Sequence, residues 1–584
     1  MFGSFTYFVM IKNKRFAFLI IFFIAGCSGC IKDFQSSTKT SKTQVSSISS
    51  TSTSVVGGSI SSDFFLSNWA AKKFTSPAFV VAAKPTGMAS TVISVNTSTV
   101  ISEISNNLGG SNANTFSGQM TDANLVANVK GLNPGLIRYP GGNISDTYFW
   151  NEPNGQLPAD VPPSVYVSNG DSTTNYFWYG QNTQSWTLSL NNYYALLQNT
   201  GSKGVITVNY SYARYGTSTN PVAAAAHLAA NWVRYDKGRT TYWEVGNENY
   251  GYWEPGWKIN TATNKDGQPM QLTGTLYGKH FLVFADSMRK AAAEIGVSIK
   301  IGAQLIAETS AATQALNPAE ANWNSGLLAS VGNQADYYIV HDYYTSASDA
   351  ASILNSATAV TQNVKTYIQQ SITSSGAQQK PIAMTEWNIF SVGSDQKVSQ
   401  IAGIHAVITQ GEMIKAGINM ATRFDLLGKW DNGDDFGTFS IGDEPDNPTL
   451  WNPRPAFYFM YYFKSFVGDQ LVSSSVNGNS NILAYASKYS TGNATGVVVV
   501  NKGSSNQYVT INIANNSATY YYYYTLVGDN SMQFSRKVYV NGQGPSTASG
   551  GPSNYASIPA NRVATAGGIS VSVPAYSVVY LVAQ

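Results

Sequence analysis

Short apolar runs alternate with longer helix-like stretches through the middle of the chain. Eight such runs lie between residues 98 and 467, and three of them are GVITV at 204–208, TYWEV at 241–245 and ADYYIV at 335–340. Between several runs, apolar residues recur at helical spacing, as in PVAAAAHLAANWVRYD at 221–236. Eight strand–helix repeats are typical of a barrel rather than of an open doubly wound sheet. We therefore predict an α/β fold in which residues 98–467 form a (β/α)8 TIM barrel.

The pattern changes after Gly468, where helical spacing stops. Short β-branched and aromatic runs follow, such as GVVVVN at 496–501 and ISVSV at 569–573, and Gly, Asn and Ser residues separate them. This pattern predicts a C-terminal antiparallel β-sandwich over residues 468–584. Residues 63–97 contain similar runs, and we expect these N-terminal strands to complete the sandwich. Tyr520–Tyr524 would then point to both faces of one strand, mainly as core residues.

The first 62 residues differ in composition from the rest. Basic residues at 12, 14 and 15 precede an eleven-residue apolar run, Phe16–Gly26, which is too short to span a bilayer because about 20 apolar residues are needed. These features are typical of a secretion signal, which we place at residues 1–26. Residues 27–62 are dominated by Ser and Thr and predict a flexible tether.

The stretch Ile24-Ala25-Gly26-Cys27 resembles the lipobox of bacterial lipoproteins. The resemblance implies that Cys27 is lipidated, and that the protein is exported and anchored to the bacterial outer membrane, on its periplasmic or its outer face. The alternative is a plain signal peptide with incidental cysteines. The only other cysteine is Cys30, which excludes a disulfide or a cysteine-based metal site beyond residue 30.

Charged residues are scarce, at 11% of the chain, and the formal net charge is only +3. No basic cluster occurs beyond residue 15, and a phosphate backbone needs concentrated positive charge. We therefore expect no nucleic-acid partner.

Polar residues gather where several predicted barrel strands end, which is where barrel enzymes place their active sites. They are Arg138 after the second strand, Asn247 and Glu248 after the fourth, His341 and Tyr343 after the sixth, and Glu386 after the seventh.

The fourth run carries two glutamates, Glu244 and Glu248. Side chains alternate along a strand, so both would point into the barrel if the strand continued to Glu248. Glu248 would lie at the mouth, whereas Glu244 would be buried and would need a partner. Arg138 is the expected cation, either in a core salt bridge with Glu244 or beside Glu386.

These strand-end motifs, taken together, resemble the clan A retaining glycoside hydrolases and are most similar to the family 51 α-L-arabinofuranosidases. The resemblance covers about residues 98–470, and the sandwich matches the architecture of that family. The motifs that carry it are Arg138-Tyr139-Pro140-Gly141-Gly142-Asn143, Asn209, Gly246-Asn247-Glu248, His341-Asp342-Tyr343 and Thr385-Glu386-Trp387-Asn388.

The resemblance implies a double displacement on an oligo- or polysaccharide, with Glu248 as acid/base, Glu386 as nucleophile and no cofactor. Such a reaction needs two carboxyls about 5–5.5 Å apart. The charge of Arg138 would lower the pKa of Glu386, and the charge of Glu386 would raise the pKa of Glu248. The remaining residues implied to bind substrate or support the site are Asn143, Asn209, Asn247 at the sugar 2-hydroxyl, His341, Tyr343 beside Glu386, and Trp387 lining the −1 subsite.

Two segments depart from the arabinofuranosidase pattern, VNYSYARYGTSTNP at 208–221 and the long loop at 429–453. They leave the reaction class intact but open the choice of sugar, so an endo-β-glycanase acting on xylan, glucan or galactan is an alternative. An alternative of another class is a non-catalytic glycan-binding surface lipoprotein.

Two further features have competing interpretations. The acidic stretch Asp431–Asp435 could ligate calcium, but a solvated loop that contacts sugar hydroxyls is favoured, and we predict no metal. Trp253 and Trp257 could stack on sugar rings or simply pack their loop.

Overall fold

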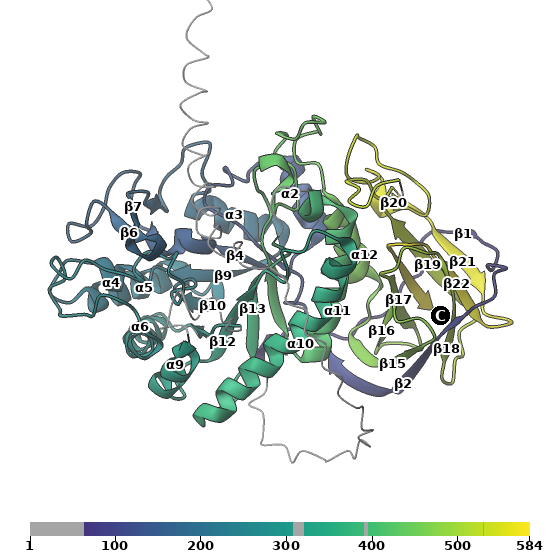
Figure 1. The fold of residues 1–584 in the computed structure, drawn as a ribbon, viewed down its shortest axis with the longest axis horizontal. Coiled ribbons are helices and arrows are strands. Elements are labelled where there is room, and N and C mark those ends of the chain that lie inside the picture. The colour runs from purple at the N-terminus through teal and green to yellow at the C-terminus, as the bar shows by residue number, and fades with distance from the viewer. Residues whose placement is uncertain (1–62, 308–320, 391–394, 530) are drawn as a thin grey trace, which may run out of the picture.

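A computed structural model describes residues 63–307, 321–390, 395–529 and 531–584. Residues 1–62, and with them Cys27 and the tether, lie outside the described residues. Eight parallel strands close into a barrel, and a second, mixed sheet lies beside it (Figure 1). The predicted fold class is confirmed. The barrel strands are β3 (Gly110–Asn112), β4 (Leu136–Tyr139), β9 (Lys203–Val208), β10 (Thr240–Val245), β11 (Lys300–Gln304), β12 (Tyr337–Asp342), β13 (Ile382–Trp387) and β14 (Met420–Arg423).

The helices that surround the barrel begin and end at recognisable capping residues. Asp122, Ser189 and Asp349 accept hydrogen bonds from the first-turn amides of α2, α3 and α10, and glycines with positive φ end α3, α10 and α11. The helices are α2 (Ala123–Leu132), α3 (Leu190–Thr200), α4 (Tyr212–Tyr215), α5 (Pro221–Asp236), α6 (Gly274–Glu294), α9 (Trp323–Val331), α10 (Ala350–Ser375), α11 (Gln400–Ala416) and α12 (Pro455–Phe466). No helix among the described residues is long and apolar enough to cross a bilayer.

The long loop after β4 carries two small sheets, β5 (Tyr148–Phe149) with β8 (Trp178–Tyr179) and β6 (Val165–Val167) with β7 (Ser172–Thr174). Short 3-10 segments occur at η3 (Gly142–Thr147), η4 (Ser168–Gly170), η5 (Asp395–Val398), η6 (Asp431–Gly433) and η7 (Tyr555–Ser557).

The amino-terminal end of the barrel is closed by a short segment that precedes it in the chain. η2 (Phe64–Leu66) buries Phe65 completely against Leu136, Val205 and Tyr242, which lie at the starts of barrel strands. Asp63 caps this segment and accepts a hydrogen bond from Asn419 at 2.7 Å. The chain therefore enters the described structure at the end of the barrel opposite the carboxyl ends of the strands.

The second sheet folds around a core of Val, Ile and Leu side chains, which explains its sandwich-like shape. Its strands are β1 (Phe79–Val81), β2 (Thr91–Glu103), β15 (Gln470–Asn477), β16 (Ile482–Lys488), β17 (Thr495–Asn501), β18 (Gln507–Ile513), β19 (Tyr520–Val527), β20 (Tyr539–Val540), β21 (Ala560–Ala564), β22 (Ile569–Val573) and β23 (Ser577–Ala583). Two pairings are parallel, β1 with β21 and β2 with β18, so the predicted purely antiparallel sheet needs correction. The two strands of each of these pairs lie far apart in the chain and are not joined by a hairpin, so they can pair in either the parallel or the antiparallel direction.

The predicted boundary at residue 98 falls inside β2, which continues in the sandwich sheet to Glu103. The first barrel strand begins only at Gly110. The prediction that the barrel starts at residue 98 is therefore wrong. The first six residues of β2, TVISVN, alternate between more and less buried positions, and most of the remaining seven are exposed, which suits a strand with one open face rather than one buried inside a barrel.

Candidate active site

Arg138, at the end of β4, is completely buried and joins the polar groups of the barrel interior. Its Nε donates to Glu244 Oε2 at 2.6 Å, and its Nη1 donates to Glu386 Oε1 at 2.7 Å. Its Nη2 donates to Asn247 Oδ1 at 2.8 Å. The two roles considered for Arg138 therefore coexist, because one planar guanidinium serves both carboxylates.

Glu386 lies on β13 and has both carboxylate oxygens held. Arg138 binds Oε1, and the Tyr343 hydroxyl donates to Oε2 at 2.7 Å. The side chain is only 3% exposed. This arrangement fixes the carboxylate in one orientation and offsets part of the cost of burying its charge.

Glu248 reaches the same place by a turn rather than by continuation of the strand. β10 ends at Val245, and Gly246 follows with φ +76 and Glu248 with φ +41. A side chain at Gly246 would place its Cβ 2.0 Å from Asn249 Oδ1, so glycine is required there. The strand therefore stops before Glu248, so the condition under which both glutamates would alternate on one strand is not met, although the Glu248 carboxylate does lie at the mouth.

His341, on β12, lies between the two carboxylates. Its Nδ1 is 3.0 Å from Glu248 Oε1 and 3.9 Å from Glu386 Oε1, and its Nε2 is 3.1 Å from Thr385 Oγ1. Oxygen atoms of Glu248 and Glu386 and a ring nitrogen of His341 all lie within 4.8 Å of one another. This separation fits the close carboxyl spacing of a retaining glycosidase.

The same three groups are close enough to hold a metal ion. Arg138, however, already places a positive charge 2.7 Å from Glu386. A second cation beside it would be repelled, so the arrangement favours an organic substrate between the carboxylates.

Comparison with known proteins agrees with this geometry. Residues 128–363 match a family model described as an alpha-L-arabinofuranosidase 1 domain. The fold resembles that of the α-L-arabinofuranosidase from Thermotoga maritima in its arabinose complex, with 17% sequence identity and a TM-score of 0.58 over 84% of this chain and 99% of that one. The chain is a glycoside hydrolase with an arabinofuranosidase-type barrel. No curated protein matches the chain in sequence.

The match to the arabinofuranosidase domain model confirms the resemblance predicted from the strand-end motifs. The hydrolase also shares its fold with other glycanases. A bifunctional glucanase-xylanase from a metagenome library is 16% identical, with a TM-score of 0.55 over 85% of this chain and 100% of that one. A family 44 xyloglucanase from Paenibacillus polymyxa is 12% identical, with a TM-score of 0.52 over 85% of this chain and 99% of that one. At these identities only the fold is shared.

The electrostatics of this hydrolase differ from one expectation. Burial would raise the pKa of Glu248, but the hydrogen bond and charge of His341, followed by Trp253 and Arg138, outweigh it, and the pKa lies below its usual value. The predicted rise is therefore wrong, because the donors around Glu248 act more strongly than the charge of Glu386. Trp253 supplies one of them, with Nε1 donating to Glu248 Oε2 at 2.9 Å.

A second buried carboxyl pair, Asp146 and Glu254, lies next to this site and is not among the residues predicted from the sequence. Asn247 Nδ2 donates to Glu254 Oε1 at 3.1 Å, and Asn249 Nδ2 donates to Asp146 Oδ2 at 2.9 Å. Within the described part of the chain, Asp146 Oδ1 and Glu254 Oε2 are buried without a donor from other residues, and the two carboxyls contact each other. Two carboxylates in this position must share a proton.

Burial raises the pKa of Asp146 to about 7, and burial together with the charge of Asp146 raises the pKa of Glu254. The only sequence signals are an Asp three residues after RYPGGN and a Glu six residues after Glu248. Neither position has a spacing that indicates a pair, because the two segments lie about 100 residues apart in the chain.

The remaining predicted site residues have different surroundings. Asn143 is half-buried, and its side chain makes no hydrogen bond to another described residue, so its amide is available. Asn209 donates to the Tyr148 carbonyl and the Tyr215 hydroxyl, and accepts from the Tyr212 amide, so its polar atoms are used in holding α4. Trp387 and Trp257 are 1% and 2% exposed, so neither presents an open ring face.

The half-exposed aromatic residues near Glu386 are instead Tyr343, Phe390, Phe424 and Phe436. Their rings form one cluster, with centroids 5.4 Å apart for Tyr343 and Phe436 and 5.6 Å apart for Phe424 and Phe436. Because Tyr343 binds Glu386 directly, this cluster forms a wall beside the catalytic carboxylate.

The acidic loop after β14 uses two of its carboxylates in ion pairs. Asp434 pairs with Lys397, and Asp435 pairs with Arg454 at 2.7 Å. Lys397 lies 3.6 Å over the ring of Phe436, and burial lowers its pKa to about 7. These contacts attach the loop to the aromatic wall and leave fewer free oxygens for calcium.

Proposed function

We propose that this hydrolase cleaves O-glycosidic bonds with retention of configuration by a two-step displacement. The observation that supports this proposal most directly is the close approach of Glu248 and Glu386, with atoms within 4.8 Å. Arg138 and Tyr343 hold Glu386 in one orientation, and that orientation suits a nucleophile.

In the first step, a Glu386 oxygen forms a bond to the anomeric carbon while the bond to the leaving oxygen breaks. Glu248 donates its proton to that oxygen. In the second step, Glu248 accepts a proton from water, the water oxygen bonds to the anomeric carbon, and the ester to Glu386 breaks. His341 Nδ1, 3.0 Å from Glu248 Oε1, orients this carboxyl for both proton transfers.

The substrate we propose is a plant- or algal-type polysaccharide, with arabinofuranosidase-like removal of side-chain sugars. Asn143 is half-buried with no side-chain hydrogen bond to another described residue, and Asn247 precedes Glu248 in the chain and keeps one amide hydrogen beyond its bond to Glu254, so both amides suit sugar hydroxyls. Endo-β-glycanase action is the second candidate, because half-exposed rings at the mouth suit a longer chain of sugars.

One experiment tests both proposals. The protein is incubated with aryl glycosides and with intact arabinan, xylan, glucan and galactan, and the anomeric form of the first product is followed by proton NMR. Retention with release of single arabinose units supports the first proposal, and retention with release of oligosaccharides supports the second. A first product of inverted configuration would exclude the two-step route.

We also propose that the enzyme is exported and attached to the outer membrane through Cys27. The described chain begins at the closed end of the barrel, so a tether to Cys27 joins the enzyme on the side away from its catalytic mouth and leaves that mouth open to substrate. A Cys27→Ser variant should lose incorporation of labelled palmitate and move to the soluble fraction. Continued labelling of this variant would contradict the proposal.

A further inference from the structure

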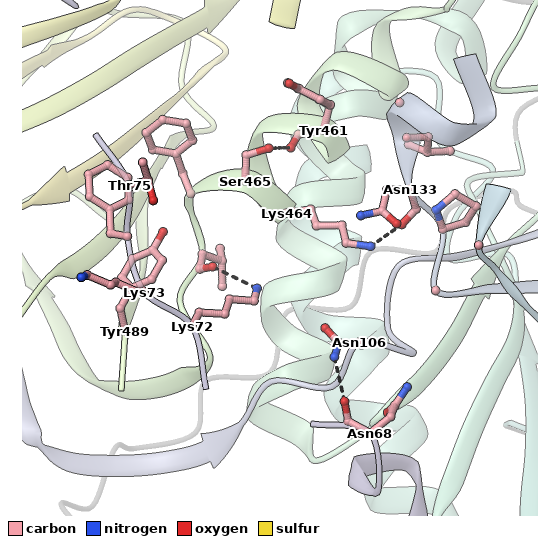
Figure 2. Close-up of a pocket in the computed structure, with 18 of the residues that line it drawn as sticks. Asn68, Lys72, Lys73, Thr75, Asn106, Asn133, Tyr461, Lys464, Ser465 and Tyr489 are labelled. Atoms are coloured by element: carbon pink, nitrogen blue, oxygen red, sulfur yellow. Dashed lines mark hydrogen bonds between the residues drawn. The ribbon is translucent and has the colours of Figure 1, made fainter. Parts of the chain in front are cut away.

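A cavity of about 790 Å³ lies at the amino-terminal end of the barrel, between the barrel, α12 and the sandwich (Figure 2). Its lining includes the segment at 68–77, the loops before β4 and β9, and the end of α12. Neither Glu248 nor Glu386 lines it. The volume is within the range of small-ligand sites, about 300–1,000 Å³.

The charge of the lining is positive. Lys72, Lys73, Lys203 and Lys464 contribute to it, whereas no Asp or Glu is among the described residues that line it. In a chain with 35 basic and 32 acidic residues, four lysines without an acidic residue in one hollow is a strong local imbalance. A concave surface lined by one sign of charge concentrates ions of the opposite sign.

Two of these lysines have amines that face main-chain carbonyls rather than carboxylates. Lys72 Nζ donates to the carbonyls of Val467 and Gly468, each at 3.3 Å, and Lys464 Nζ donates to the carbonyl of Asn133. Burial and the charge of Lys72 lower the pKa of Lys464 to about 8. Asp469 lies close enough to offset part of the charge of Lys72. A bound anion would relieve the repulsion between the two amines.

The polar and aromatic groups of the cavity add to this chemistry. The Tyr489 hydroxyl is buried without a hydrogen-bond partner in the described structure, and a buried hydroxyl without a partner is costly. Tyr461 presents a half-exposed ring, and the amides of Asn68 and Asn106 lie on the same lining. Rings, amides and cations together are the groups that bind an acidic sugar.

We propose that this cavity binds a segment of a sugar chain that carries carboxylate or sulfate groups. Lys72 and Lys464 contact the anionic group, Tyr461 packs against a sugar ring, and the Tyr489 hydroxyl and the amides bind sugar hydroxyls. The site lies at the opposite end of the barrel from the catalytic pair, so it holds a polysaccharide without taking part in its cleavage. It does not depend on which bond the enzyme cleaves.

The test is calorimetric titration of the whole chain, carrying Glu386→Gln to prevent hydrolysis, at low salt. The ligands are a short oligogalacturonate, a sulfated oligosaccharide and an uncharged xylo-oligosaccharide of equal length. We expect at least one acidic ligand to bind, to weaken as salt rises, and to lose about tenfold or more in affinity in Lys464→Met and in Lys72→Met. Lys464→Arg keeps the charge and should retain most of the binding. Lys290→Met, at an exposed lysine on α6, is the matched control and should bind as the parent does.

Several outcomes would overturn the proposal. Equal binding of the charged and uncharged ligands would do so, as would acidic binding that both Met variants leave unchanged. If the acidic ligands do not bind and phosphatidylglycerol vesicles bind in a Lys464-dependent way, the cavity is a lipid headgroup site instead. Thermal unfolding of each variant verifies folding, and activity of the Lys464→Met variant with intact Glu386 separates this site from the catalytic proposal, since turnover of aryl glycosides should be unchanged.

Discussion

Two pairs of buried carboxyl groups lie at the same end of the barrel and are stabilised in different ways. The catalytic pair, Glu248 and Glu386, is surrounded by cationic and neutral donors, above all Arg138 and His341. The neighbouring pair, Asp146 and Glu254, is held by amide and hydroxyl donors, and its two carboxyls face each other.

The difference shows what each pair can do. A nucleophile needs a fixed orientation when substrate arrives, and Arg138 supplies one by its ion pair with Glu386 at 2.7 Å. A pair that shares a proton carries less charge and can form a rigid hydrogen-bonded support. Asn247 links the two pairs, because its amide accepts from Arg138 and donates to Glu254. We expect the first pair to control the reaction and the second to hold Asn247 in place.

Removing the nucleophile should have the largest effect. Glu386→Ala should lower kcat/KM by about 10⁴-fold or more, because the two-step route is lost. Added azide should restore product formation from an activated aryl glycoside, with inverted configuration at the anomeric carbon. Glu248→Ala with azide should instead give the retained product. The reverse assignment of products would exchange the roles of the two glutamates.

Removing the buried cation Arg138 should have the second-largest effect, and that effect is on the stability of the fold. Arg138→Met leaves Glu244 and Glu386 buried without their common partner, and breaking a buried ion pair in this way costs about 3–5 kcal/mol. Denaturant unfolding at neutral pH measures this loss. Arg138→Met with Glu244→Gln should recover part of it, since one of the two unpaired charges is then absent. A single variant as stable as the parent would contradict the description of Arg138.

Replacing His341 should change the pH profile more than the fold. His341→Asn removes the largest of the contributions that lower the pKa of Glu248, so that pKa should rise. The alkaline limb of kcat/KM, where the acid/base loses its proton, should therefore move to higher pH. A shift to lower pH would mean that another group controls this limb.

The proton-sharing pair should affect stability with a different pH dependence. The pKa of Asp146 is raised from 3.8 to about 7, so the folded state holds a proton that the unfolded state releases between these values. Stability should fall as pH rises through this window, with the full cost present above about pH 7. Glu254→Gln replaces one acid by a donor, and its stability relative to the parent should improve by roughly 1–2 kcal/mol between pH 5 and 8. A difference that does not vary with pH would exclude proton sharing.

The catalytic pair, Glu248 and Glu386, can be predicted from the sequence. The proton-sharing pair, Asp146 and Glu254, cannot, for a physical reason. The strand ends of a barrel converge on one face, so the residues that follow each apolar run can be assigned to one site from their positions in the chain alone. Asp146 lies in the short 3-10 segment η3 and Glu254 in a loop, and the paths of such segments depend on contacts such as Gly246 against Asn249 that have no periodicity. For the same reason the burial of Trp257 cannot be predicted, because burial in a loop leaves no pattern, and Trp387 is the last residue of β13, where a side chain can point into the barrel mouth or away from it.

The fold shows the same limit at the start of the barrel. β2 and β3 follow each other closely in a stretch of mixed polar and apolar residues, so the sequence does not show where the sandwich strand ends and the first barrel strand begins. β3 has only three residues, which is too few for a hydrophobic period to be recognised. Strongly apolar strands such as β9 are predicted correctly because nearly every residue is buried.

The smallest expected effect comes from Trp253, and it tests the catalytic half of the comparison most finely. Trp253→Phe keeps an aromatic ring but removes the Nε1 donor 2.9 Å from Glu248 Oε2. The pKa of Glu248 should rise, but less than in His341→Asn, because His341 contributes more to lowering it. Activity at the optimum should change by about two- to fivefold, with a small displacement of the alkaline limb in the same direction. If the displacement in Trp253→Phe equals or exceeds that in His341→Asn, the indole rather than the imidazole contributes most to lowering the pKa of Glu248, and the roles of the two donors must be exchanged.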